Sequence, residues 1–141
     1  MGLIRVDHDR GLALFRFSGR MTVPQFRDTF VGYVTGPGFS RDHLMLSDLR
    51  AVDELVADFS SMFQAVQGLG RVLRQFDGKA HAVLMVESEV NFGIARMLQQ
   101  VVGVFSAVRI DVARGPAEAG EYCGRSGEEM ASILSAGLAA D

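Results

Sequence analysis

Disulfides and basic clusters are both ruled out by what this chain of 141 residues lacks. It has one cysteine, Cys123, and therefore no internal disulfide, which is typical of proteins that fold in a reducing compartment. No two basic residues are adjacent, and the formal net charge is −3. The electrostatic signature of nucleic-acid binding is therefore missing.

Long apolar segments are missing as well. No apolar run approaches the roughly 20 residues that a membrane-spanning helix needs. The first ten residues lack the apolar stretch of a signal peptide, so we expect a cytoplasmic protein without a membrane span. With 48% hydrophobic and 22% charged residues, the composition is that of one globular domain covering residues 1–141.

Motifs for catalysis and metal binding are also absent from the sequence. There is neither a G-x-S-x-G nucleophile motif nor a G-x-x-x-x-G-K-[ST] phosphate loop. The three histidines, His8, His43 and His81, have no spacing suited to zinc, although His43 and His81 begin strands that can be neighbours. We expect Cys123 to be a buried structural thiol. The sequence therefore predicts no enzyme, no catalytic residues, no cofactor and no metal site.

Alternating and continuous apolar patterns predict five strands. Residues 3–7 and 12–18 flank the turn residues Asp9, Arg10 and Gly11, which indicates an antiparallel hairpin. The strands at 43–46 and 80–86 carry continuous apolar runs, which are typical of strands buried on both faces of a parallel sheet. Residues 108–112 alternate, which predicts an edge strand.

Five helices are expected between and after these strands. They cover about 22–34, 57–76, 88–105, 116–124 and 126–139. The last begins with the capping-box pair Ser126 and Glu129 and carries an apolar stripe. The stripe consists of Met130, Ile133, Leu134 and Leu138. Such a short helix needs a surface to cover, which is either its own domain or a second copy in a homodimer.

The order of the elements predicts an α/β fold. We expect a mostly parallel, five-stranded mixed sheet with one antiparallel edge strand and helices packed on it. Parallel sheets present ligands at the carboxyl ends of their strands, where Asp48, Arg50, Glu87, Ser88 and Arg114 fall in this sequence. These residues are our candidate ligand or partner surface, and helix capping and exposed ion pairs are the competing interpretation.

Several sequence pieces, taken in order, resemble one superfamily of small domains. They are F-S-G-R-M-T after the hairpin, L-M-L-S-D-L-R around the third strand, Gly93, and V-R-I-D-V-A-R-G-P-A-E-A-G-E-Y-C near the end. Between about residues 3 and 124 the chain resembles the STAS-like, SpoIIAA-like superfamily. The resemblance implies an α/β regulatory domain with a protein partner. Related folds include lipid-binding CRAL-TRIO domains and transporter-associated STAS domains.

The resemblance also bears on phosphorylation. In the classical branch, a serine two positions after an aspartate is phosphorylated, and here the aspartate matches Asp48 while Arg50 occupies the position of the serine. Ser47 lies on the other side of Asp48. We therefore expect no classical phosphorylation switch.

Two functional hypotheses follow from the sequence. The first is a non-catalytic regulatory or protein-interaction domain of STAS-like type. The alternative is a domain that binds a small apolar ligand or a lipid, since seven methionines and ten phenylalanines can line an adaptable pocket as well as fill a core. An enclosed apolar pocket would favour the alternative, and a solid core with an exposed apolar patch would favour the first.

Overall fold

Residues 2–76 and 80–139 are described by the structure, a computed structural model. The elements, in chain order, are β1 (Gly2–Asp7), β2 (Leu12–Thr22), α1 (Val23–Val34), β3 (Leu44–Val56), α2 (Phe59–Gly68), α3 (Gly70–Leu73), β4 (His81–Val86), α4 (Glu89–Phe105), β5 (Arg109–Arg114), α5 (Pro116–Cys123) and α6 (Gly127–Ala139). No helix in the described ranges is both long enough and apolar enough to cross a membrane.

The five strands form one mixed sheet in the order β1-β2-β3-β4-β5. β1 pairs antiparallel with β2, and the other neighbours pair in parallel. This confirms the predicted fold class, with β1 as the antiparallel edge. The two doubly apolar runs lie in the central strands β3 and β4, while the alternating runs lie in the edge strands β1 and β5.

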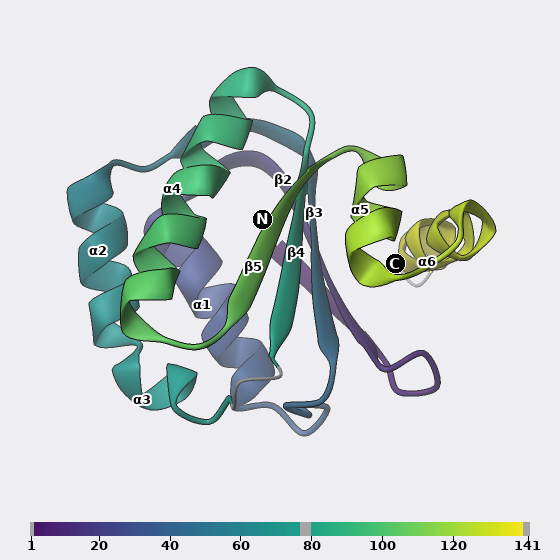
Figure 1. The fold of residues 1–141 in the computed structure, drawn as a ribbon, viewed down its shortest axis with the longest axis horizontal. Coiled ribbons are helices and arrows are strands. Elements are labelled where there is room, and N and C mark those ends of the chain that lie inside the picture. Colours follow the sequence, from purple (N-terminus) through teal and green to yellow (C-terminus); the bar gives the residue numbers. More distant parts are fainter. Residues whose placement is uncertain (1, 77–79, 140–141) are drawn as a thin grey trace.

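Helices cover both faces of the sheet. Figure 1 shows α1, α2 and α4 on one face and α5 and α6 on the other. The sheet therefore separates two apolar clusters, and we call them the first core, under α1, α2 and α4, and the second core, under α5 and α6. Because helices cover both faces of the sheet, Leu46 and Val83 in its central strands are 0% exposed.

β3 is much longer than the predicted strand at 43–46. Its last pair with β4 joins Asp48 to Met85, yet it continues beside β2 as far as Val56. β2 likewise extends past residue 18, where the backbone of Gly19 has a φ of 73° and the register with β3 shifts. The prediction ended β3 too early because its second half loses one neighbouring strand and no longer reads as doubly buried.

The single helix predicted over 57–76 is wrong in one respect. The helix is broken at Leu69, which separates α2 from α3, and glycines flank the break. A Cβ at Gly68 would meet open space, so close packing does not require a glycine at this position. The low helix propensity of glycine accounts better for the interruption.

The predicted C-terminal helix is present as α6. Its start is capped as expected, because Ser126 Oγ accepts a hydrogen bond from the backbone N–H of Glu129 at 3.1 Å. Met130, Ile133 and Leu134 are 2%, 4% and 7% exposed and belong to the second core. The stripe therefore packs on its own domain. The side chain of Leu138, the fourth predicted member, lies outside the described part.

Candidate functional site

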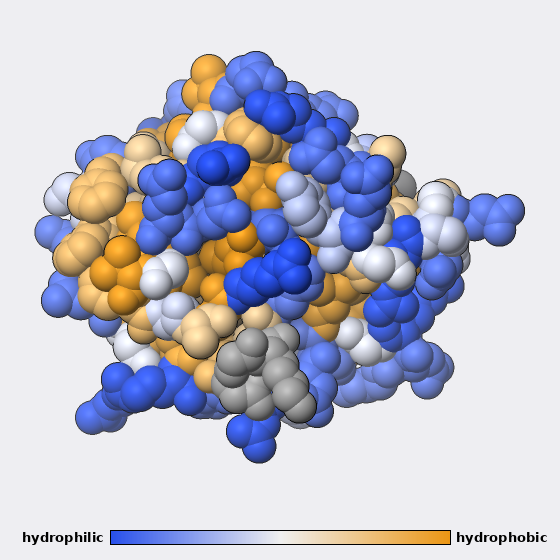
Figure 2. Space-filling view, viewed as in Figure 1, coloured by the Kyte–Doolittle hydropathy of each residue, from blue (hydrophilic) through white to orange (hydrophobic). Residues whose placement is uncertain are grey.

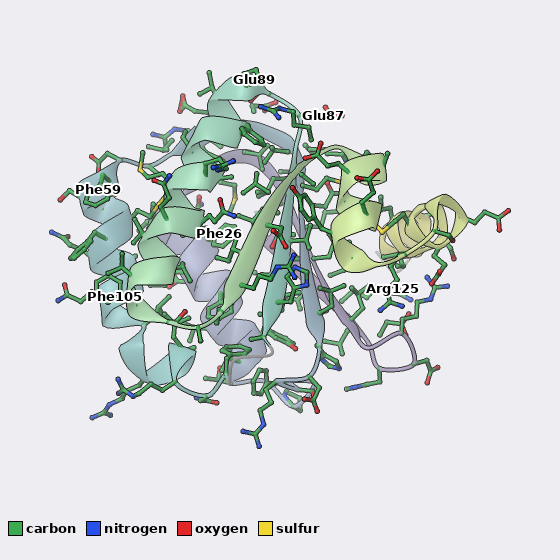
Figure 3. The ribbon with its side chains drawn as sticks, viewed as in Figure 1. Phe26, Phe59, Glu87, Glu89, Phe105 and Arg125 are labelled. Carbon is green, nitrogen blue, oxygen red and sulfur yellow. The ribbon has the colours of Figure 1, made fainter. Side chains whose placement is uncertain are left out.

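An apolar cavity of about 140 Å³ lies in the first core, between the sheet and the helices α1, α2 and α4. Its floor comes from strand residues whose side chains point to this face, and its roof from the inner faces of the helices. Representative lining residues are Phe17 and Met45 from the sheet, Phe26 from α1, Met62 from α2 and Leu98 from α4. Figure 3 shows Phe26 in the interior, between the helices and the sheet.

The cavity can hold an apolar molecule but offers few polar groups. The polar side chains among its lining residues are Thr22, Arg27 and Ser47, within the described part of the chain. Thr22 is engaged, because its hydroxyl oxygen accepts the N–H of Gln25 at 3.3 Å in a capping box at the start of α1. Dry apolar cavities of about 150 Å³ accept molecules as large as benzene.

Aromatic and thioether side chains form much of the cavity wall. The rings of Phe17 and Phe26 stack with their centroids 4.9 Å apart. Met21, Met45 and Met62 also line the cavity, and methionine adapts its shape more readily than other apolar residues. The high methionine and phenylalanine content of the sequence was the signal for this site, but the cavity itself depends on packing that the sequence does not display.

The predicted surface at the strand ends contains a buried ion cluster. Asp48 is 5% exposed, and Arg50 donates to both of its carboxylate oxygens at 3.0 Å. These hydrogen bonds raise the pKa of Arg50. Arg16 of β2 lies opposite Asp48 with its Nε 3.5 Å from Oδ2, and it also donates to the carbonyl oxygen of Leu134 in α6. Sequence reasoning missed Arg16, because only the strand register brings it to Asp48.

Glu87, Ser88 and Arg114 are spread along the same edge of the sheet. Glu87 is exposed, and its charge contributes to the raised pKa of Arg50. Ser88 caps α4 by accepting the N–H of Asn91 at 3.0 Å. Arg114 instead pairs with Glu89 at 3.1 Å, at the edge where Figure 3 places Glu87 and Glu89. These contacts are those of capping and ion pairing, so the cavity is the stronger candidate site.

The histidines fall into two separate clusters. The Tyr33 hydroxyl donates to the carbonyl oxygen of Ser40, so its oxygen can accept from His43 Nδ1 at 2.7 Å, and His43 Nε2 lies 3.2 Å from His8 Nδ1. Burial, followed by the charge of His8, lowers the pKa of His43. His81 instead donates to Asp111 at 2.7 Å.

These clusters do not assemble into a metal centre. Within residues 2–76 and 80–139, no three histidine, cysteine, aspartate or glutamate side chains are grouped so that they could hold a metal ion.

Cys123 lies at the edge of the second core, half-buried on α5. Burial raises the pKa of its thiol to about 11, with the charge of Asp111 acting in the same direction and that of Arg125 opposing it. A thiol with this pKa is a poor nucleophile at neutral pH.

Comparison with known proteins supports the fold and adds no activity. No family model matches the chain, and no curated protein matches it. A crystal structure of an uncharacterized protein from the DUF3478 family of Shewanella loihica PV-4, with a SpoIIAA-like fold, is similar with a TM-score of 0.51 and 12% identity. The match covers 86% of this chain and 91% of that one. The SpoIIAA-like fold, expected from the sequence resemblance, is therefore confirmed.

Proposed function

We propose that this domain is a non-catalytic binding module that holds a small apolar molecule between its sheet and the helices α1, α2 and α4. The observation that carries the proposal is the cavity of about 140 Å³, with its nearly continuous apolar lining. Natural interiors are close-packed, and voids larger than a water molecule are few. This cavity is partly open to solvent, so a ligand can enter it, and ligand binding accounts for its apolar lining.

The cavity volume sets the size and affinity of the ligand. A tail of about six carbons would gain roughly 5 kcal/mol at ~0.8 kcal/mol for each buried methylene group. The loss of translational and rotational freedom on binding offsets part of this gain, so we expect a dissociation constant near the millimolar range for a minimal ligand. Longer chains require the methionine and phenylalanine side chains of the wall to move.

The methionines allow a direct test by NMR with ¹³C-methyl labelling. Met21, Met45 and Met62 line the cavity, whereas Met85 and Met130 are buried in the second core, on the other side of the sheet. Titration with 1-hexanol should shift the methyl signals of the first three and leave those of the other two in place. The variant Ala65→Leu narrows the cavity and should weaken the response. Equal shifts in both groups, or an unchanged response in the variant, would refute the proposal.

Absence of catalysis is part of the proposal. It is supported by the raised pKa of Cys123 and by a cavity wall that offers one charged side chain. A classical phosphorylation switch is not expected either, since the position of the acceptor serine holds Arg50, which is hydrogen-bonded to Asp48. The neighbouring Ser47 is only 6% exposed. Incubation with an anti-sigma kinase and ATP should leave the protein mass unchanged, and stoichiometric phosphate on Ser47 would contradict this.

A second candidate is the regulatory or protein-interaction role that the fold suggests. It is favoured by an apolar patch on the outer side of α2 and α4, where Phe59 is 58% exposed and Val104 72%. Phe63 links Phe59 to Phe105 through ring contacts at 5.8 and 5.0 Å. Figure 2 shows apolar side chains gathered over these two helices.

Self-association offers a test of this second candidate. Sedimentation velocity over a range of concentrations should show association that the double variant Phe59→Ser, Val104→Ser removes. If the wild-type protein stays monomeric at every concentration, the patch does not bind a second copy of this chain.

A further inference from the structure

Arg27 is a cavity-lining residue that is also partly exposed to solvent. It lies on α1 and lines the cavity, while 41% of its side chain is exposed and its guanidinium group is paired with the exposed Asp28. It is the one charged side chain among the lining residues, within the described part of the chain. A ligand in the cavity therefore has one positively charged residue among its neighbours.

The existing partner of Arg27 leaves most of its donors available. Both Nε and Nη2 donate to one oxygen of Asp28, at 3.2 and 3.1 Å. Asp28 is the next residue along α1 and its side chain is 70% exposed, and an exposed pair of this kind contributes little. A guanidinium carries five N–H donors in a planar fork, so Arg27 can bind a second carboxylate while Asp28 stays in place.

We propose that the ligand is a short-chain monocarboxylate, with its hydrocarbon tail in the cavity and its carboxylate paired with Arg27. This rests on the proposed function, because it names the ligand of the same cavity. One cation among the lining residues matches one anionic head, whereas a phosphate group would face a single arginine already shared with Asp28. The cavity volume limits the enclosed tail to about six carbons, since about 150 Å³ accommodates benzene.

Hexanoate and 1-hexanol are the probes that separate the head from the tail. They share six carbons, but only hexanoate carries a charge at pH 7. The methyl signals of Met21, Met45 and Met62 report binding, as in the titration above. In the wild-type protein, hexanoate should bind about threefold to tenfold more tightly than 1-hexanol, the range expected for a charge-assisted pair that is partly exposed.

Two variants and salt then test the role of Arg27. Arg27→Gln should lower the ratio of hexanoate affinity to 1-hexanol affinity to about one. Arg20→Gln is the matched control, since Arg20 is exposed, pairs with Glu54 and does not line the cavity, so the preference should persist. Added salt should weaken hexanoate binding to the wild-type protein and spare 1-hexanol, a measurement that does not depend on either variant folding.

The outcomes distinguish this proposal from the one on which it rests. If 1-hexanol binds in the cavity as tightly as hexanoate, or if Arg27→Gln weakens both equally, the carboxylate proposal fails while the binding function stands. If neither probe shifts the three methionines, the proposed function fails and this proposal fails with it.

Discussion

The side-chain amide of Asn91 donates a hydrogen bond to the backbone carbonyl oxygen of Val52 at 3.2 Å. Val52 lies in the part of β3 that has passed its last pair with β4, so its carbonyl has no strand neighbour on that side. Asn91 is 3% exposed in the first turn of α4, and its amide supplies the hydrogen-bond donor that a neighbouring strand would otherwise provide. One side chain thus joins the helix layer to the free edge of β3.

Removal of this amide should destabilise the domain. Asn91→Ala leaves the Val52 carbonyl buried and unpaired, which costs about 1–3 kcal/mol in the free energy of unfolding. Urea denaturation provides the measurement. Gln100→Ala, at an exposed position of the same helix, is the control and should change the free energy by less than ~0.5 kcal/mol. Equal values for the two variants would show that the hydrogen bond contributes nothing.

Two ion pairs on the same strand pair should differ sharply in their contribution to stability. Arg16–Asp48 and Arg20–Glu54 both join β2 to β3 in register, but the first pair is 15% and 7% exposed and the second 66% and 62%. Asp48→Asn removes a buried carboxylate that pairs with two partly exposed arginines, Arg16 and Arg50, and should cost about 3 kcal/mol. Glu54→Gln should cost at most ~1 kcal/mol. Similar losses by urea denaturation would contradict the burial argument.

Acidification should weaken the fold partly through His43. Its pKa is lower in the folded protein than in the unfolded chain, because the buried ring resists a charge. Below the ordinary histidine pKa of about 6.5 the unfolded chain therefore binds the proton more readily, and stability falls as the pH falls. The stability difference between wild type and His43→Gln should be largest at pH 8 and shrink toward pH 5. A difference independent of pH would exclude this linkage.

Cys123 should react slowly with thiol reagents. A pKa of about 11, against an ordinary 9.0, lowers the thiolate fraction at pH 8 to about one hundredth of its ordinary value. Labelling of the native protein with a disulfide reagent should be at least that much slower than labelling in urea, and its rate should still rise with pH above 9. Rapid labelling of the native protein would show that the thiol is activated.

The C-terminal helix should stabilise its own chain. Deletion of residues 126–141 exposes the surface that Met130, Ile133 and Leu134 cover, and should lower the melting temperature while the mass from light scattering falls only by the deleted segment. Ile133→Ala should cost about 2–4 kcal/mol, and the exposed Ser135→Ala less than ~0.5 kcal/mol. A halved mass after deletion would instead place the stripe in a dimer interface.

The sequence predicted the sheet well because burial leaves a local pattern. Doubly apolar runs marked the central strands β3 and β4, and alternating runs marked the edges. The extension of β3 was missed because Asp53 and Glu54, beyond the last pair with β4, look like loop residues, although β2 still pairs there. The break near Leu69 was missed because the apolar stripe continues through it.

The candidate site was only partly predictable. Composition indicated an adaptable apolar interior, but a cavity arises from the shapes that facing side chains leave unfilled, and no local pattern encodes these. The ion pair between Arg16 and Asp48 depends on strand register. The contacts of His43 with Tyr33 and His8 depend on how three separate segments of the chain come together in the fold. Arg27 looked like an ordinary exposed helix residue, since only its position beside the cavity distinguishes it.

The empty space in the first core also has an evolutionary consequence. The side chains that line this space lack part of the packing they would have in a filled core, which lowers the stability of the fold. Exchange of Ala65 or Ala95 for a larger apolar residue would recover part of this with one mutation each. A lineage released from selection for the ligand should therefore accumulate bulkier residues at these two positions. Small residues retained at these two positions across distant descendants would indicate continued selection for ligand binding.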